Sequence, residues 1–204
     1  MFYYYYDGTY LLVVIGALLS LMASAKVKSS FARYSNVRSM SGMTGREAAE
    51  RILRNSGIYD VQVQHIYGNL TDHYDPRNKV LSLSDSVYNS NSVAAIGVAA
   101  HECGHAIQDA RDYAPLRIRG AIVPVVNFGS MLSWPIIIIG ILLSFNHFLI
   151  TFGIILFSLT VLFQLVTLPV EFDASSRALR ILGDTHMLYE DELRGARKVL
   201  SAAA

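Results

Sequence analysis

A long stretch without charge constrains the fold of this chain more than any other feature. No Asp, Glu, Lys or Arg occurs between Gly120 and Val170, and two apolar runs, residues 121–143 and 148–168, fill this stretch. The first run is long enough for roughly 34 Å of helix, which matches the hydrocarbon core of a bilayer. Neither run offers the polar face that a hairpin in a soluble protein would need. The sequence therefore predicts a transmembrane helical hairpin at residues 121–169.

A third apolar run lies near the N-terminus, at residues 10–25, and follows the aromatic run at residues 2–6. The run is short for a membrane span, but tyrosines are favourable at the headgroup level and extend it. A cleaved signal peptide is the alternative. It is disfavoured because signal peptides begin with a basic region, and no Lys or Arg precedes this run. We therefore expect residues 1–25 to form an N-terminal membrane anchor.

Basic residues indicate how these spans are oriented. Those next to the apolar runs all lie on the ends away from the N-terminal tail and the hairpin link: Lys26, Lys28, Arg33, Arg38, Arg111, Arg117, Arg119, Arg177 and Arg180. Cytoplasmic segments of membrane proteins are enriched in Lys and Arg. The pattern predicts a multi-pass protein of the cell membrane whose polar parts face the cytoplasm, with the N-terminus and Asn146 outside.

The polar residues 26–120 predict a small α+β region on the cytoplasmic side. Thr44 and Glu47 have the spacing of a capping box, and a helix is expected to follow them. A second helix is expected over residues 91–109, capped by the Asn or the Ser at its start. Residues 170–204 are expected to form further helices, at 171–182 and 190–201, that complete a mainly α membrane protein.

Two short strands are expected between these helices, at residues 61–67 and 79–83. Both runs have the strand pattern, and the Asp-Pro-Arg-Asn sequence at 75–78 is typical of a turn. A peptidase commonly holds its substrate against an open strand edge, where main-chain hydrogen bonds position it. We hypothesise that the second strand, near Leu81 and Leu83, offers such an edge.

The motif HECGH at residues 101–105 carries the chemistry. On a helix, residues four apart share a face, so His101 and His105 can reach one zinc ion. Zinc binds neutral imidazole nitrogens and keeps a position for water in a catalytic site. Glu102 is placed to take a proton from that water as general base. Two histidines on a surface helix are the alternative, which is disfavoured because the small apolar residues 94–100 predict a buried helix.

A third metal ligand must come from further along the chain. Glu171 directly follows the third span and the HECGH helix precedes the second, so a tight hairpin returns Glu171 to the side of His105. His147 lies in the hairpin link, across the membrane from the motif. His186 is the fallback ligand and Asp173 a weaker one. The topology therefore favours Glu171.

Helical spacing also suggests partners for the ligands. Ser175 lies four residues after Glu171, and Asp109 lies four residues after His105. A ligating histidine usually donates its second N–H to a carboxylate or a carbonyl oxygen. Asp109 and Asp173 are therefore candidates for this contact, with a solvated surface acid as the simpler interpretation of each.

Four segments resemble the YugP-type membrane zinc metallopeptidases: MTGREAAERIL, DPRNKVLSLS, VAAHECGHAIQ and PVEFDASSRAL, in this order. The similarity extends over nearly the whole chain, and the arrangement is also similar to the HtpX class. The resemblance implies a zincin-like fold in a bacterial membrane, zinc held by His101, His105 and Glu171, and catalysis by Glu102. Members generally continue beyond GARKVLSAAA, so it also implies a further apolar span after Ala204.

Three functions are compatible with these features. An endopeptidase that acts on membrane or membrane-proximal proteins or peptides is favoured, because a structural zinc site has no use for an adjacent base. A zinc-binding membrane scaffold or chaperone is the alternative. A transporter is disfavoured because Asn127 and Gln164 are the only amides within the hairpin runs and no ionisable residue marks a path. Nucleic acid is not an expected partner, since the net charge is only +1.

Overall fold

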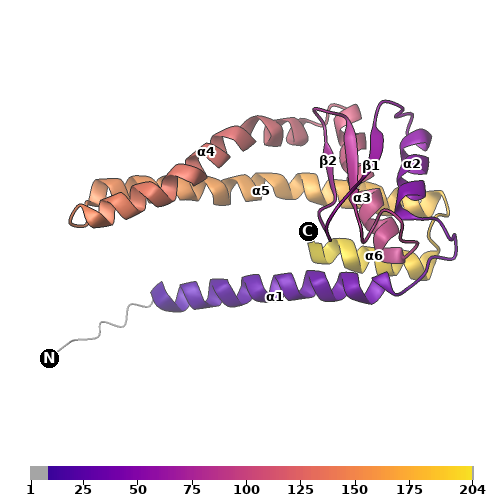
Figure 1. The fold of residues 1–204 in the computed structure, drawn as a ribbon, viewed down its shortest axis with the longest axis horizontal. Coiled ribbons are helices and arrows are strands. Elements are labelled where there is room, and N and C mark those ends of the chain that lie inside the picture. The colour runs from indigo at the N-terminus through magenta and orange to yellow at the C-terminus, as the bar shows by residue number, and fades with distance from the viewer. Residues whose placement is uncertain (1–8, 204) are drawn as a thin grey trace.

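A computed structural model of the protein describes residues 9–203, so the aromatic run at residues 2–6 lies outside the described residues. Helices dominate the fold and a small sheet accompanies them, as expected (Figure 1). The elements follow one another as α1 (Thr9–Ser35), α2 (Gly45–Asn55), β1 (Gln62–Ile66), β2 (His73–Asp75), β3 (Val80–Ser84), α3 (Val93–Ala110), α4 (Ala114–Leu142), α5 (His147–Asp184) and α6 (Glu190–Ala203).

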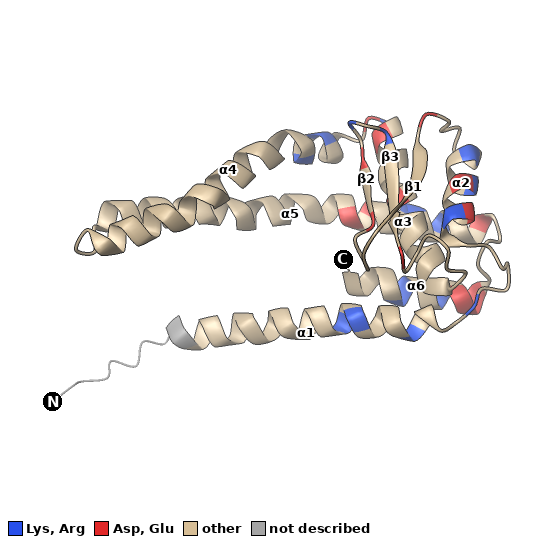
Figure 2. Cartoon of the chain, viewed as in Figure 1, with Lys and Arg blue, Asp and Glu red and all other residues tan. Residues whose placement is uncertain are grey.

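Helices α1, α4 and α5 are each long and apolar enough to cross a membrane. All three extend in the same direction from a small domain that the other elements form (Figure 1). Charged residues stop at about the same level along the three helices (Figure 2). In the sequence these last charged positions are Lys26 in α1, Arg119 in α4 and Glu171 in α5. This level separates an apolar part of the molecule from a polar one.

All three helices extend beyond the expected segments, and α4 begins at Ala114 instead of at residue 121. Helix α1 continues beyond residue 25 to Ser35, and α5 is one continuous helix through Pro169 where two separate helices were expected. The second half of α5 remains helical because one face of it is buried in the small domain. Residues at a spacing of four form this face: Val170, Ala174, Ala178 and Leu182.

Small residues let α4 and α5 pack closely in the hairpin. A Cβ atom on Gly153 would lie 2.5 Å from the Cγ1 atom of Ile137 in α4. Gly129 and Ser133 are buried in α4 as well, and the Leu156 side chain of α5 faces Gly129. Helix α5 is therefore the partner against which these two residues pack. Small residues are common where helices pack in membranes because they allow close approach.

The sheet has the order β1-β3-β2, and β3 pairs parallel with β1 and antiparallel with β2. The prediction that the strand at Leu81 and Leu83 offers an open edge is therefore wrong, because both edges of β3 are paired. Both leucines are fully buried. Strand β2 was not predicted, since it is short and its His and Asp are poor strand formers. Its pairing with β3 holds it extended, and its outer edge is free among the described elements.

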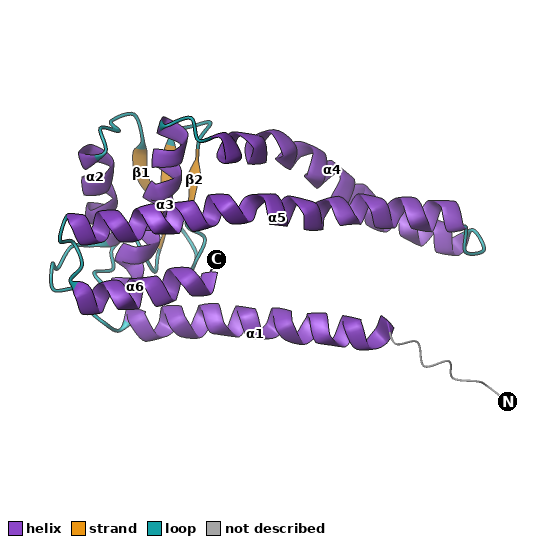
Figure 3. Ribbon diagram, turned by 180° about the vertical axis from the view of Figure 1, so that it is seen from behind, coloured by secondary structure: helices purple, strands orange, loops and turns teal. Residues whose placement is uncertain are grey.

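Helix α3 lies at the centre of the small domain, in contact with α2, α5, α6 and the sheet (Figure 3). Of the two candidate caps, Ser92 begins the helix, because its Oγ accepts a hydrogen bond from the N–H of Ala95 at 3.2 Å. Helix α2 begins with the predicted capping box at Thr44 and Glu47. Most residues of α3 are buried, so this helix supports the candidate site from within the core.

Candidate metal centre

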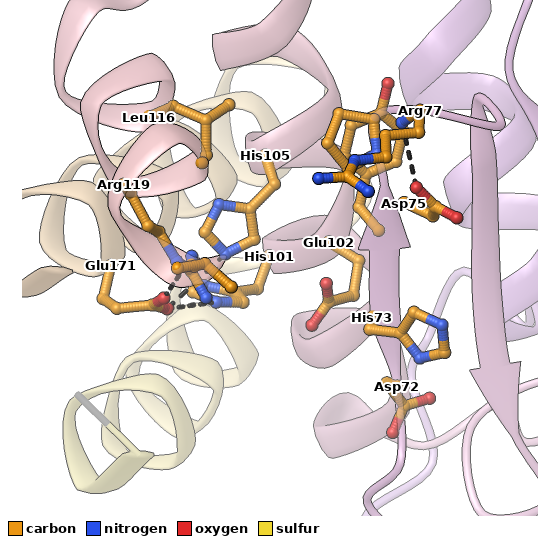
Figure 4. A pocket seen from close by; sticks show the side chains of 14 residues that line it. Asp72, His73, Asp75, Arg77, His101, Glu102, His105, Leu116, Arg119 and Glu171 are labelled. Atoms are coloured by element: carbon orange, nitrogen blue, oxygen red, sulfur yellow. Dashed lines mark hydrogen bonds and ion pairs between the residues drawn. The ribbon is translucent and has the colours of Figure 1, made fainter. Parts of the chain in front are cut away.

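Three side chains from two helices converge on one point (Figure 4). The Nε2 atom of His101 lies 3.2 Å from Oε2 of Glu171, and the Nε2 atom of His105 lies 3.5 Å from the same oxygen. The ligand atoms of all three residues lie within 4.8 Å of one another. The histidines come from α3 and the glutamate from α5, so the spacing of four and the return of the hairpin place these residues together.

The separations between the Glu171 carboxylate and the two imidazoles fit a zinc ion. Donors about 2.0–2.1 Å from a tetrahedral ion lie roughly 3.3–3.4 Å from each other. The distances of 3.2 and 3.5 Å from Glu171 to the two imidazoles are close to that value. Two imidazoles and one carboxylate are also a donor set that zinc accepts.

A very close approach of α3 and α5 makes this convergence possible. Gly104 lies within the HECGH motif, and a Cβ atom at this position would be 2.6 Å from the carbonyl oxygen of Ala174. No other residue type allows the two backbones to come so near, since every other side chain begins with a Cβ. Gly104 and Ala174 therefore set the distance between the histidines and Glu171.

The second oxygen of Glu171 is held by an arginine. The Nη1 atom of Arg119, on α4, donates to Oε1 of Glu171 at 3.0 Å. Oε2 is thereby left to face the imidazoles. The nearby carboxylates of Glu171 and Glu102 also outweigh burial and raise the pKa of His105. The centre therefore favours a positive charge between the imidazoles and Glu171.

Each histidine has a partner for its second ring nitrogen. Nδ1 of His101 lies 3.1 Å from the Oγ atom of Ser175, as helical spacing predicted. Nδ1 of His105 lies 3.0 Å from Oε1 of Gln108. Asp173 approaches His105 only through Gln108, whose amide nitrogen donates to the Asp173 carboxylate at 2.8 Å. These contacts orient both rings.

Asp109 was one of two candidate partners for a histidine ring, and it contacts other residues in place of His105. Its carboxylate accepts hydrogen bonds from the Tyr74 hydroxyl at 2.8 Å and from Nζ of Lys79 at 2.6 Å. Burial and the bond to Asp109 raise the pKa of Tyr74, and the bond raises that of Lys79. Asp109 lies at the end of α3, so it ties the sheet to the helix instead.

The other residues considered as ligands lie outside this cluster: Asp173 contacts Gln108 and Arg177 instead. His147 begins α5 at the tip of the hairpin, far from α3 (Figure 1). His186 follows α5 in the turn before α6. Among the described residues, His101, His105 and Glu171 form the group whose ligand atoms meet.

Glu102 lies between the histidines and strand β2 (Figure 4). Its side chain is buried, and burial raises the pKa of its carboxyl above the ordinary value. Both cavities at the centre have Glu102 in their walls. A buried carboxylate with a raised pKa that still faces an open cavity is suited to accept and return a proton.

Two cavities meet beside His101, Glu102 and Glu171. The larger has a volume of about 540 Å³ and extends from β2 and the following turn to Leu116, Gly120 and Val123 of α4. The smaller, of about 220 Å³, is lined mainly by apolar residues of α1, α3 and α6. The centre is therefore open to cavities on two sides.

Comparison with known proteins agrees with this centre. A family model described as "Putative neutral zinc metallopeptidase" matches residues 9–204. The chain belongs to this family. The protein described as "Putative membrane protease YugP", from Bacillus subtilis (strain 168), is 50% identical over 196 residues, which cover 96% of this chain and 87% of the relative. The resemblance found in the sequence is confirmed. The comparison with solved structures gave no match.

Sequence reasoning missed two residues at the centre of this zinc metallopeptidase family member. Gln108 lies three residues after His105, a spacing that places it on the same helix face. Arg119 is the last charged residue before the second span, just as Glu171 is the first after the third. That symmetry places both at the same level, and it was available in the sequence.

Proposed function

We propose that this protein is a zinc-dependent endopeptidase of the cell membrane that hydrolyses peptide bonds of membrane or membrane-proximal proteins. The observation that supports it best is the convergence of His101, His105 and Glu171 beside the buried carboxylate of Glu102. Membership of the zinc metallopeptidase family supports the same assignment. The two histidines of HECGH with a downstream glutamate are the donor set of a gluzincin-like centre.

His101, His105 and Glu171 would hold the ion in this proposal. A zinc ion held there supplies Lewis-acid chemistry, which polarises a peptide carbonyl and lowers the pKa of a water molecule. Glu102 accepts a proton from that water and delivers it to the leaving amine nitrogen. The raised pKa makes the carboxylate a stronger base for the first transfer. The leaving amine nitrogen is more basic still and takes the proton from the carboxyl group in the second.

Strand β2 is proposed to position the substrate in place of β3. It is the edge strand next to the centre, and His73, Tyr74 and Asp75 line the larger cavity together with Glu102. An extended peptide that adds to this edge would be held by main-chain hydrogen bonds across the cavity. The contacts of Asp109 with Tyr74 and Lys79 fix the sheet relative to α3 and thus to the histidines.

The position of the larger cavity supports substrates close to the bilayer. Its wall includes Gly120 and Val123, at the beginning of the apolar part of α4. Glu171 is the first charged residue of α5, and the charged parts of α4 and α5 begin at about the same level (Figure 2). A substrate bond that reaches the centre is therefore cleaved close to the membrane surface. We propose that this surface is the cytoplasmic one, because the basic residues flank the spans on this side.

The proposal is tested with the purified full chain in detergent, by zinc analysis and by mass spectrometry of peptides released from bacterial membrane proteins. Wild type is expected to bind one zinc ion and to release peptides, and a chelator should stop release. The Glu102→Gln variant should keep its zinc but lose turnover by about 100-fold or more, the range expected for a general base.

The outcome also separates a peptidase from a zinc-binding scaffold. Glu102→Gln has nearly the same shape as wild type, so a scaffold role would survive it. Absence of peptide products from the zinc-loaded wild type, together with equal behaviour of wild type and variant in cells, would contradict the peptidase proposal and favour the scaffold.

A further inference from the structure

Gln108 is a fully buried polar residue next to the metal centre. It lies on α3, three residues after His105, and its side chain is completely excluded from solvent. Burying an amide is costly unless its donors and acceptor are all paired. Its three hydrogen bonds meet this requirement: Oε1 faces Nδ1 of His105 at 3.0 Å, and Nε2 donates to the Val170 carbonyl at 2.9 Å and to Asp173 at 2.8 Å.

The partners on α5 fix the orientation of this amide. The Val170 carbonyl oxygen and the ionised carboxylate of Asp173 can only accept hydrogen bonds. Both therefore require the NH₂ group of Gln108 on their side, and the flipped amide would place its oxygen against two other oxygens. The carbonyl oxygen of Gln108 must then point at His105.

This orientation determines which nitrogen of His105 carries the proton. An amide oxygen accepts and cannot donate, so Nδ1 of His105 must be the N–H donor. In the neutral ring, Nε2 is then left with its lone pair, and Nε2 is the atom that faces Glu171 at 3.5 Å. Ser175 imposes no such choice on His101, because a hydroxyl can donate or accept.

We propose that Gln108 is a positioning residue that sets the tautomer and orientation of His105, so that its Nε2 lone pair points at the metal site. The asymmetry between the two histidines follows from their partners: His105 has a fixed acceptor, whereas His101 has an adaptable hydroxyl. This inference rests on the proposed function, since it assumes that the centre holds zinc. Through Val170 and Asp173, the same amide links the orientation of His105 to α5, the helix that brings Glu171.

Two substitutions separate positioning from a merely structural role. Gln108→Met keeps the length of the side chain and removes its hydrogen bonds. Gln108→Glu keeps an oxygen that accepts from Nδ1 of His105. It loses the amide donor toward α5, so the new carboxylate faces the Val170 carbonyl and the Asp173 carboxylate, which are both acceptors. Zinc affinity of the full chain in detergent is measured by competition with a chelator. The absorption spectrum of the cobalt-loaded protein reports the ligand geometry, and thermal unfolding of the metal-free forms reports the fold.

If Gln108 positions His105, Gln108→Met should weaken zinc binding by about 10–100-fold, the usual effect of removing a partner of a ligand, and should change the cobalt spectrum. Gln108→Glu should bind zinc more tightly than the Met variant although its metal-free form is less stable than wild type. Equal zinc affinity of wild type and Gln108→Met would overturn the inference. So would a folded Glu variant that binds zinc no better than the Met variant, because the side chain would then act only as a link to α5. Failure of wild type to bind zinc would instead contradict the proposed function.

Discussion

The carboxylate of Glu171 divides its two oxygens between different partners. Oε2 faces the imidazoles of His101 and His105, while Oε1 accepts from Arg119 at 3.0 Å. A charged hydrogen bond of this kind is stronger than a neutral one and holds the carboxylate in one orientation. Arg119 thus comes from one helix of the hairpin to orient a residue of the other.

We expect Glu171→Gln to weaken zinc binding by more than about 100-fold. Replacing a residue that only contacts a ligand typically weakens metal binding by roughly 10–100-fold, whereas this change removes the negative charge of a ligand itself. Asp184→Asn is the matched control, because Asp184 is an exposed acid at the far end of the same helix, thirteen residues after Glu171. Zinc content after dialysis against a weak chelator measures both. Equal losses in the two variants would show that Glu171 is not a ligand.

At the scale of elements, the crossing of α3 and α5 positions the centre. The two helices meet where Gly104 faces the Ala174 backbone, one residue before His105 on one side and three residues after Glu171 on the other. Packed helices are close to incompressible, so an added methyl group must move one of them. The ligands move with the helices because they lie within one turn of the contact.

Gly104→Ala should therefore lower stability by about 1–3 kcal/mol, the usual effect of overpacking, and weaken zinc binding as well. Gly16→Ala in α1 is the control, because no atom lies within 4 Å of the added Cβ there. Thermal unfolding and chelator competition measure the two effects. Unchanged zinc affinity in Gly104→Ala would mean that the close approach of α3 and α5 at Gly104 does not set the distance between the histidines and Glu171.

The central position of β3 changes what a proline there would do. Leu81 is fully buried and pairs with Val63 of β1 and Tyr74 of β2. Proline removes a ladder hydrogen bond and is tolerated essentially only on edge strands. We expect Leu81→Pro to misfold the small domain and to lose zinc together with activity, which protease resistance and zinc content would reveal. A folded, zinc-loaded Leu81→Pro protein without activity would restore the idea of a substrate edge on β3.

For the whole molecule, the common direction of the three apolar helices gives one polar side and one apolar side (Figures 1 and 2). In the proposed orientation the hairpin tip at Ser144 lies across the membrane from the small domain, where Tyr59 is 81% exposed. The buried Cys103 supplies the one native thiol of the sequence. Single introduced cysteines can therefore map the two sides.

In a Cys103→Ala background, Ser144→Cys should react with a membrane-impermeant maleimide added to intact cells, because the proposed orientation puts the hairpin tip outside. Tyr59→Cys should react only after the membrane is permeabilised, since the small domain is proposed to face the cytoplasm. Gel shift of the labelled protein measures both. The reverse pattern would place the centre on the outer side and contradict the proposed orientation.

Several features could be predicted from the sequence because their causes are local. The apolar runs, the capping box at Thr44 and the spacing of His101 and His105 depend on residues that are neighbours in the chain. Glu171 could be favoured and His147 set aside because a short link forces a hairpin to return beside its start. The resulting cluster agrees with that reasoning.

Only the tertiary structure decided how the elements meet. It showed that β3 is central and β2 is the edge, that α5 is continuous through Pro169, and that Gln108 in place of Asp109 contacts His105. Each of these depends on burial and on contacts between residues far apart in the sequence, which override local propensity. A periodic pattern shows which face of a helix is buried. The element that covers this face, and the side chains it brings, are decided by how closely the backbones can pack.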